Sequence, residues 1–367
     1  MKHLGFYLRN LMIIGNIGLS LFMVLCAYSP YVDPKFHPAW ACVGMAFPAF
    51  LFAELAFLLY WLFVRWQLTS IPFFTLLICG SAVRAYIPFN GYENVLPDDC
   101  IKFLSYNTMA FANGIPHKKD DPNPVLDYIL TSGADIVCLQ EYIVTGGRNR
   151  LSKKDVAKAL SVYPYRVTME IGTNGNGLAC YSRYPILSQK KLAYKSQYNG
   201  SAMYQLLIDG DTVVIINNHL ESNKLTIQDK KAYYEMMTSP PEKQKLKQGV
   251  SLIVSKLSEA MAIRAYQVDF VAHTIDSLCL KGRTVIACGD FNDTPISYTH
   301  KCLTKYLHSA FVQSGNGLGI SYNQNGFYFR IDNILLSKNL RSYQCKVDNG
   351  VKCSDHYPIV SYLKKEE

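Results

Sequence analysis

Long apolar runs dominate the first quarter of this chain. They lie at about 11–28, 39–64 and 68–87, and they contain only two charged residues, Glu54 in the second run and Arg84 in the third. A helix that crosses the ~30 Å hydrocarbon core of a bilayer needs about twenty residues, and each run is close to that length. The pattern predicts three transmembrane helices, which makes the chain an integral membrane protein.

Basic residues beside these runs indicate their orientation, because lysine and arginine concentrate on the cytoplasmic side. Lys2 and Arg9 precede the first run, and Arg65 lies between the second and third. The loop with Asp33 and Lys35 has no net charge. The N-terminus is expected inside, so three spans place the following domain outside the cytoplasm. The two further spans argue against a cleaved signal peptide.

Glu54 lies near the middle of the second run. A carboxyl group inside a membrane is a candidate functional group by default. Two other interpretations remain open. The side chain can be protonated and hydrogen-bonded between helices, or it can lie near the end of a helix whose bounds differ from those predicted.

A different pattern begins near Cys100. Short runs of β-branched and aliphatic residues predict strands, and amphipathic segments between them predict helices. The expected strands are residues 101–107, 135–140, 177–182, 203–208, 212–218, 283–289, 331–337 and 358–363, and the expected helices are 124–131, 153–162 and 255–280. Hairpin-like and crossover spacings are mixed, which favours an α+β or sandwich architecture. The chain thus divides into a membrane region (1–89), a linker (90–99) and a second domain (100–367).

Residues 223–248 form the least regular part of this second domain. The segment holds six lysines, three acids and the Pro240–Pro241 pair. A basic insertion beside the active site would attract a phosphate-rich substrate or an anionic lipid surface. A solvated surface excursion explains the composition equally well.

Polar residues suited to phosphate chemistry follow several of the predicted strands. They occur in the short sequences FLSYN, CLQE, NNHLES, CGDFN, RIDN and SDH. Each places a polar side chain at a strand tip, which predicts one acidic, histidine-bearing pocket. The candidate residues are Asn107, Glu141, His219, Asp290, Asn292, Asp332, Asp355 and His356.

These residue types fit metal-assisted hydrolysis of a phosphate ester. Mg²⁺ prefers carboxylate oxygens and keeps several waters, a role that suits Glu141. An imidazole oriented by a carboxylate can activate water near neutral pH, as His356 and Asp332 would. Amide, imidazolium and metal groups can neutralise the charge on the phosphate oxygens.

The order of these motifs resembles the endonuclease/exonuclease/phosphatase superfamily of DNase I-like enzymes. The resemblance runs from about Cys100 to about Leu363 and rests on all six motifs together. Any one of these residues alone fits an ordinary turn or strand end better than a catalytic role. The resemblance implies a four-layer α/β sandwich of two mainly antiparallel sheets flanked by helices. It also makes residues 100–367 the catalytic domain.

The resemblance implies a role for each residue at the metal. Glu141 becomes the principal metal ligand, and Asn107 and Asp355 become its neighbours, directly or through water. The expected ion is Mg²⁺, with Mn²⁺ as an alternative. Some relatives carry an acid two places after the motif asparagine, where this chain has Met109. A second metal site built on that acid is therefore not expected.

The remaining residues are implied to act on water and phosphate. Asp290 and Asn292 would orient or deprotonate the attacking water and hold the phosphate. Asp332 would fix the ring of His356, which acts as base or phosphate clamp. His219 would contact the phosphate or assist the leaving group.

The apolar runs, the motifs and the resemblance together suggest three functions. The first is a membrane-anchored phosphoesterase, similar to bacterial inner-membrane members of the family, acting on a lipid-linked or headgroup phosphate outside the cytoplasm. The second is an endonuclease or DNA-end-processing phosphodiesterase, and the third is a catalytically idle membrane scaffold. A net charge of +9 fits a polyanionic partner, either a bilayer or nucleic acid. The sequence does not indicate an oligomeric state.

Eleven cysteines give no zinc-binding spacing. Cys345 with Cys353, and Cys279 with Cys302, are close enough in sequence for disulfides. The spacing alone leaves both pairings open.

Overall fold

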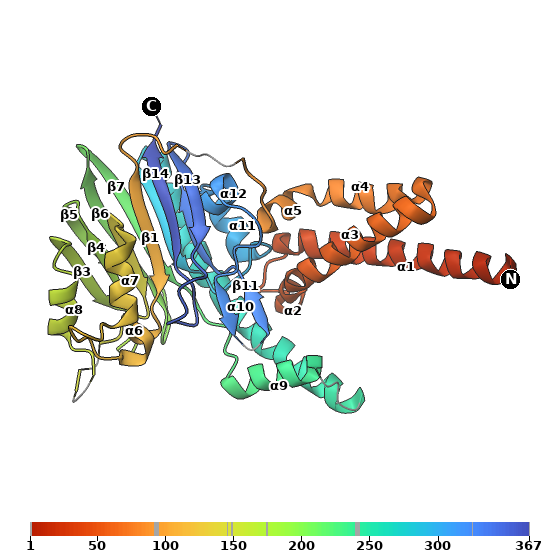
Figure 1. Ribbon diagram of the computed structural model, residues 1–367, viewed down its shortest axis with the longest axis horizontal. Helices are drawn as coiled ribbons and strands as arrows, with labels where there is room; N and C mark the ends of the chain where they lie inside the picture. Colours follow the sequence, from red (N-terminus) through yellow and green to blue (C-terminus); the bar gives the residue numbers. More distant parts are fainter. Residues whose placement is uncertain are drawn as a thin grey trace.

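The computed structural model describes residues 2–91, 95–144, 146–147, 150–173, 175–238, 243–324 and 326–366. An elongated group of N-terminal helices projects from one side of a β-sandwich (Figure 1). These helices are α1 (Lys2–Tyr28), α2 (Pro38–Ala41), α3 (Phe47–Val64), α4 (Ser70–Ile78) and α5 (Gly80–Tyr86), with short 3-10 turns at Ser29–Tyr31, Cys42–Ala46 and Trp66–Thr69.

Two N-terminal helical segments, Gly5–Tyr31 and Pro38–Val64, are long and apolar enough to cross a membrane. The third predicted run is different. Its two segments, Trp66–Ile78 and Gly80–Tyr86, are bent by 69° at the break between them, so they add a third span only if the bent pair acts as one. The structure therefore supports two spans and leaves the third as a broken helix.

Glu54 is fully buried between α1 and α3. Its two carboxyl oxygens accept hydrogen bonds from Asn16 Nδ2 at 3.1 Å and from Ser20 Oγ at 2.6 Å. Trp61 Nε1 donates to Asn16 Oδ1 at 2.9 Å. Of the interpretations left open by the sequence, hydrogen bonding between helices is the one observed.

The first six-stranded sheet has the order β13-β14-β1-β2-β4-β3. Its strands are β1 (Ile101–Asn107), β2 (Ile136–Gln140), β3 (Tyr165–Glu170), β4 (Gly177–Ser182), β13 (Leu340–Val347) and β14 (Ile359–Lys365). Only β1 and β2 run parallel; the other neighbours are antiparallel.

The second six-stranded sheet has the order β5-β6-β7-β8-β12-β9. Its strands are β5 (Ile186–Lys191), β6 (Gly200–Ile208), β7 (Asp211–His219), β8 (Thr284–Asp290), β9 (His308–Ser309) and β12 (Asp332–Leu336). Here β7 and β8 form the one parallel pair. A separate hairpin pairs β10 (Tyr322–Gln324) with β11 (Phe327–Phe329).

The two sheets pack face to face, and helices cover their outer faces (Figure 1). The core between the sheets includes Phe103, Cys138, Tyr204 and Ile286. Helices α6 (Met109–Gly114), α7 (Pro124–Ser132) and α8 (Lys153–Ala159) pack on the first sheet, and α10 (Lys243–Leu280) and α11 (Tyr298–Thr304) pack on the second. The short α12 (Ala310–Ser314) adds Phe311 to the core between the sheets. The predicted four-layer sandwich is confirmed.

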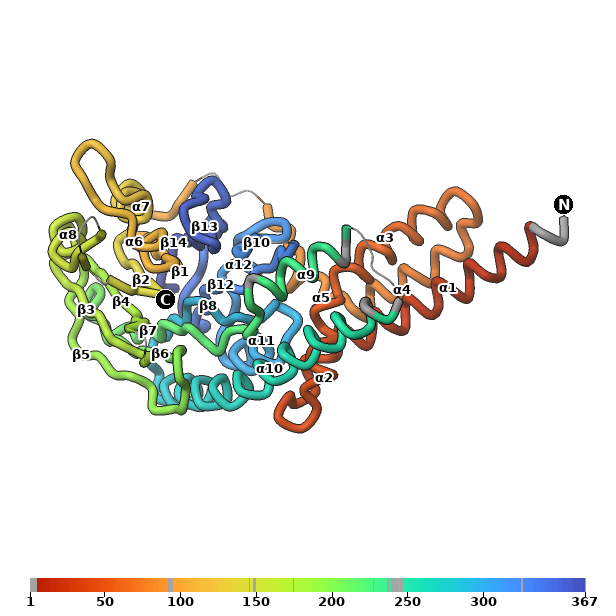
Figure 2. Tube along the Cα trace, turned by 90° about the horizontal axis from the view of Figure 1, so that it is seen from below, coloured from red at the N-terminus to blue at the C-terminus, as the bar shows by residue number. Residues whose placement is uncertain are grey.

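The segment predicted to be irregular is largely helical. Residues Ile227–Thr238 form α9, and α10 begins at Lys243, ahead of the predicted start at residue 255. The Pro240–Pro241 pair lies outside the described residues. Lysine and glutamine are good helix formers, so composition alone did not exclude these helices. Both helices reach out in the direction of the N-terminal helices (Figure 2).

Side chains from both parts of the chain meet where the N-terminal helices join the sandwich. Lys35 Nζ donates to Asp269 Oδ2 on α10 at 2.5 Å. Arg330, which is buried, donates to the main-chain oxygen of Ala85 at the end of α5. Gly44 lies so close to the Ile296 carbonyl that an added Cβ would be 2.4 Å from its oxygen. A side chain at position 44 would therefore separate the two parts.

Two smaller expectations concern the linker and the cysteines. Residues 92–94 of the proposed linker lie outside the described residues, but Asn90 packs on the domain and donates to the carbonyl of Val312 at 3.2 Å. All eleven cysteines are free, so neither suggested disulfide is formed.

Candidate active site

The site is built from strand ends that meet at one edge of the sandwich. Parallel β7 and β8 bring His219 opposite Asp290, and antiparallel β12 begins with Asp332 opposite Asp290. In the other sheet, parallel β1 and β2 bring Asn107 opposite Gln140, so Glu141 follows directly at the same edge. Parallel strands end at the same edge, and an antiparallel partner begins there.

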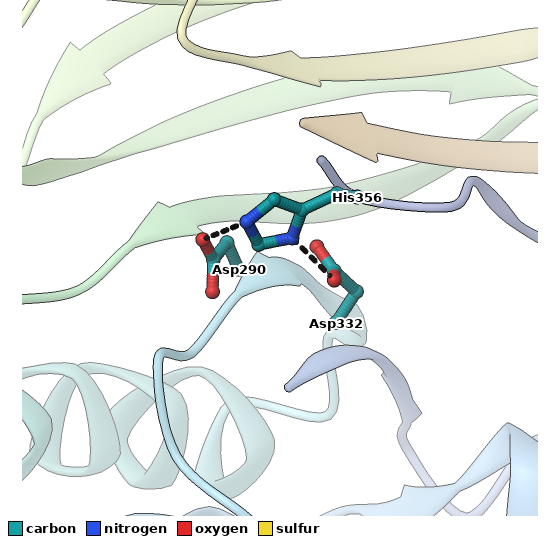
Figure 3. Close-up of side chains that lie close together, drawn as sticks. All are labelled: Asp290, Asp332 and His356. Atoms are coloured by element: carbon teal, nitrogen blue, oxygen red, sulfur yellow. Dashed lines mark hydrogen bonds and ion pairs between the residues drawn. The ribbon is translucent and has the colours of Figure 1, made fainter. Parts of the chain in front are cut away.

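Three of these side chains form a compact buried group, shown in Figure 3. His356 Nδ1 lies 2.8 Å from Asp332 Oδ2, and His356 Nε2 lies 3.6 Å from Asp290 Oδ2. All three are nearly inaccessible to solvent. Because a carboxylate only accepts, the Nδ1–H of the ring donates to Asp332, which fixes the orientation of the ring.

Electrostatics favour the charged form of His356. Burial lowers the pKa of the imidazole, but the nearby Asp332 and Asp290 carboxylates outweigh it and raise the pKa to about 10. Burial and Asp332 raise the pKa of Asp290, against the opposing effect of His356. His356 is therefore an imidazolium near neutral pH in this arrangement, with N–H donors on both sides of the ring.

Asn107 links this group to Glu141. Its Nδ2 donates to Glu141 Oε1 at 3.2 Å and to Asp290 Oδ2 at 3.1 Å, while its Oδ1 accepts from the Met109 N–H at 3.2 Å. Burial raises the pKa of Glu141, and Asp355 adds to this effect. A cation at this position would relieve the repulsion between these carboxylates.

His219 lies on the other side of Asp290. Its Nε2 is 3.9 Å from Glu141 Oε1 and 3.8 Å from Asp290 Oδ2. Its Nδ1 is 3.5 Å from Asn176 Nδ2, an amide that can only donate. Burial lowers the pKa of His219. A neutral His219 consequently carries its proton on Nε2, facing the two acids.

Asn292 acts on Asp290 through its main chain. Its N–H donates to Asp290 Oδ1 at 2.8 Å, and its side-chain amide donates to the Leu220 carbonyl at 2.9 Å. The main chain of Asn292 has φ of 52°, a left-handed conformation that asparagine tolerates better than most residues. The second bond ties the loop after β8 to the loop after β7.

The backbone at this edge is strained. Glu141 has φ of 50°, and residues 109–113 all have φ between 46° and 59°, which makes α6 a left-handed turn. Each non-glycine residue in a left-handed helix costs roughly 1–2 kcal/mol. Hydrogen bonds from Thr108 Oγ1 and the Ala110 N–H to the Glu141 carbonyl hold the turn against the end of β2. Such strain persists where the surrounding structure fixes it, and it concentrates at functional sites.

The donor set fits a hard divalent cation. Glu141 is the most exposed of the site carboxylates adjoining Asn107, with 32% of its side chain accessible, so it can exchange water for metal. Ligand atoms of Asp290, Asp332 and His356 also lie within 4.8 Å of one another. These three groups are nearly inaccessible to solvent, however, and His356 Nδ1 is already hydrogen-bonded to Asp332. We therefore favour Glu141 as the principal ligand.

All eight residues predicted from the sequence lie at or beside this edge, and several further residues that were not singled out from the sequence also contribute. Asp332 N–H donates to Ser321 Oγ at 3.0 Å, and the ring of Tyr322 lies 5.0 Å from that of His356. Gln140 is buried and donates to Asn217 Oδ1 at 2.7 Å. The contributors missed by sequence reasoning are Gln140, Asn176, Asn217, Lys230, Ser321 and Tyr322. Asn176, Ser321 and Tyr322 come from loops or the short strand β10, and Lys230 comes from α9, whereas Gln140 and Asn217 lie within the CLQE and NNHLES motifs.

Arg264 supports the two loops behind the site. Its fully buried guanidinium lies 3.1 Å from Asp293, and its Nε donates to the Glu221 carbonyl at 2.9 Å. Replacing Arg264 with methionine keeps the volume but leaves the Asp293 carboxylate buried without a cation. We expect the free energy of unfolding to fall by about 3 kcal/mol, measured by thermal unfolding in detergent.

The matched control is Lys224→Met. Lys224 pairs with Glu259 at 2.7 Å, but 64% of the Glu259 side chain is exposed. Exposed pairs contribute about 1 kcal/mol or less, so the control should unfold close to the wild type. Equal midpoints for both variants would contradict a supporting role for Arg264.

Comparison with known proteins agrees with this geometry. Residues 9–86 match a family model described as a domain of unknown function. No curated protein sequence matches the chain significantly. The human Nocturnin catalytic domain with bound sulfate has a TM-score of 0.50 and 16% identity, covering 72% of this chain and 93% of that one. Humanized D. rerio TDP2 has a TM-score of 0.50 and 15% identity, covering 72% of this chain and 99% of that one.

At these identities the two structures show similarity of fold. The family model is more specific, because residues 104–356 match the endonuclease/exonuclease/phosphatase family. That range begins in β1 and ends at His356, so it includes every strand end that contributes to the site. The chain belongs to the endonuclease/exonuclease/phosphatase family.

Proposed function

We propose that the chain is a membrane-anchored phosphoesterase that depends on a divalent cation. The main support is the meeting of Glu141, Asp290, Asp332 and His356 at one edge of the sandwich. This group combines a carboxylate suited to Mg²⁺ or Mn²⁺ with a buried imidazolium and an acid of raised pKa. A catalytically idle scaffold has no need for three buried ionisable groups in contact.

In the proposed reaction, a water oxygen bonds to phosphorus and the P–O bond to the leaving group breaks. Asp290, held by the Asn292 N–H, receives the proton of the water, and a raised pKa makes its carboxylate a better base. His356 donates to a phosphate oxygen while Asp332 fixes its ring. The His219 Nε2–H donates a hydrogen bond to the leaving oxygen, which takes up its proton from solvent water, and Asp290 returns the proton that it received to solvent.

Glu141 would hold the metal ion, with Asp355 and Asn107 beside it. Asn107 Oδ1 already accepts the Met109 N–H, so we assign it to contact through water. A divalent ion there would stabilise the negative charge that develops on the phosphate oxygens.

The N-terminal helices support a substrate at a membrane. They contact the catalytic domain directly through Arg330 and Lys35, which keeps the site near the bilayer that the helices would enter. If the bent segment Trp66–Tyr86 completes a third span, the basic residues flanking α1 favour a catalytic domain outside the cytoplasm. We propose a lipid-linked or headgroup phosphate as substrate, with a bacterial inner membrane as its location.

A substrate panel tests the function. The full chain in detergent, with Mg²⁺ or Mn²⁺, would be assayed on a polyprenyl phosphate, a sphingomyelin-like lipid, duplex DNA and an aryl phosphodiester. We expect the highest kcat/KM on a lipid phosphate and loss of turnover with a chelator. Highest activity on DNA would favour the nuclease function instead. No hydrolysis of any substrate with either metal would refute the phosphoesterase proposal.

A further inference from the structure

Helix α9 brings a lysine to the active-site edge. Lys230 Nζ is hydrogen-bonded to the hydroxyl of Tyr322. The same nitrogen lies 5.0 Å from the centre of the Tyr322 ring. Because it contacts the hydroxyl, it approaches the ring from its edge and does not stack on its face. The ammonium group therefore donates one N–H to Tyr322 and has two further N–H donors.

Tyr322 connects this lysine to the catalytic group. Its ring centre lies 5.0 Å from that of His356 at 61°, and the main chains of the two residues pair in an isolated antiparallel bridge. Burial lowers the pKa of Lys230, whereas Asp355 and Glu141 raise it. Lys230 is thus within electrostatic reach of the proposed metal ligands, one aromatic ring away from His356.

The position of Lys230 is fixed by contacts on both sides of it. Tyr233, one turn further along α9, stacks against Phe327 of β11 with ring centres 4.5 Å apart. At the start of the helix, Asp229 accepts from the Thr226 N–H at 2.7 Å and from Lys256 Nζ at 2.6 Å. Residues three apart share a helix face, so Tyr233 and Lys230 dock together on the β10–β11 hairpin.

Lys230 differs from its neighbour Lys231 in its ion pairing. Among the described residues, no carboxylate lies within ion-pair distance of Lys230. Lys231 pairs with Glu235 at 3.8 Å, and 75% of its side chain is exposed. A partly buried ammonium group without a counter-ion is costly. The arrangement suits an anion that arrives with the substrate.

We propose that Lys230 and Tyr322 form a subsite for a second phosphate, joined to the one that is hydrolysed. This inference rests on the proposed function and names its substrate class, a diphosphate ester. We assign Asp290, His356 and the proposed metal ligands to the phosphorus atom that is attacked. Lys230 is then available to bind the neighbouring phosphate. Attack by water on one phosphorus then breaks the anhydride P–O bond, and the second phosphate leaves with a negative charge that Lys230 stabilises.

Binding measurements test this subsite without requiring turnover. Methylenediphosphonate, which cannot be hydrolysed, and methylphosphonate would be titrated into the full chain with Mg²⁺ by calorimetry. We expect Lys230→Met to weaken diphosphonate binding about tenfold or more, as for loss of a charge-assisted hydrogen bond, and methylphosphonate binding by less than threefold. Lys230→Arg should retain most of the affinity, and Tyr322→Phe should lose part of it. Lys231→Met is the matched control and should bind both ligands like the wild type.

Turnover measurements then distinguish a lipid diphosphate from a soluble nucleotide diphosphate as the substrate. The ratio of kcat/KM for diphosphate over monophosphate would be measured with farnesyl esters in micelles and with uridine nucleotides in solution. We expect Lys230→Met to lower this ratio about tenfold for the source that the wild type prefers. If Lys230→Met weakened both phosphonates equally, or neither, or if wild type did not bind the diphosphonate, the second-phosphate subsite would be wrong. Failure of the phosphoesterase function itself would appear as absent turnover despite intact diphosphonate binding.

Discussion

Glu141→Ala is expected to reduce Mg²⁺-dependent hydrolysis by about 10³-fold, equivalent to about 4 kcal/mol of transition-state stabilisation. The substitution removes the most accessible carboxylate of those that adjoin Asn107, and with it the proposed principal metal ligand. The measurement is kcat/KM on the best substrate of the panel across a titration of Mg²⁺. High Mg²⁺ should restore little activity, because the other two proposed ligands, Asn107 and Asp355, offer only an amide and one carboxylate.

Glu170→Ala is the matched control for this variant. Glu170 also lies at a strand end, but it is exposed on the edge strand β3. Its loss should leave kcat/KM within about twofold of wild type, as expected for a surface change. If Glu141→Ala retained activity within threefold of wild type, the metal could not depend on Glu141.

Asp290→Asn should lower kcat by about 10³-fold while leaving the fold intact. The amide keeps the size of the carboxylate, and its single oxygen can accept from the Asn292 N–H or from Asn107 Nδ2, although no longer from both. It cannot take up the proton of the attacking water, and it no longer carries the charge opposite His356. Burial already raises the pKa of Asp290, so loss of this carboxylate's charge is not expected to lower the thermal midpoint by much.

The control for this second variant is Asp211→Asn, at the opposite end of β7, where the acid is exposed and pairs with Lys365. That variant should retain wild-type kcat. A pH profile gives the mechanistic readout, because the rising limb that a carboxylate base produces should disappear in Asp290→Asn. Wild-type kcat with an unchanged profile would rule out Asp290 as the base.

The interior strands were predictable from sequence because both of their faces are buried. β1, β2, β4, β7, β8 and β12 are mainly apolar, buried runs; of these, β1, β2, β7 and β8 end in a polar motif, and β12 begins in one. The edge strands β3, β5 and β13 were missed, since β3 and β5 are largely exposed and β13 mixes polar with apolar residues. Exposure at a sheet edge weakens the apolar signal on which such predictions depend.

The site residues were predictable for a related reason. Most lie at or next to the end of an interior strand, and Asp355 and His356 lie just ahead of β14, so their positions followed once the strands were identified. Lys230 and Tyr322 could not be found in this way, because α9 and the β10–β11 hairpin have short or weakly apolar sequences. Their position depends on the Tyr233–Phe327 contact, which joins residues almost a hundred positions apart.

The left-handed turn at residues 109–113 cannot keep its conformation outside this fold. Five successive non-glycine residues in that conformation oppose roughly 5–10 kcal/mol of backbone preference. A peptide cut from this stretch would relax to the opposite hand, so the loop has its shape only while the ends of β1 and β2 hold it. The α6 turn therefore forms one structural unit with the ends of β1 and β2, where Asn107 and Glu141 lie. It cannot be transferred to another protein without these strand ends.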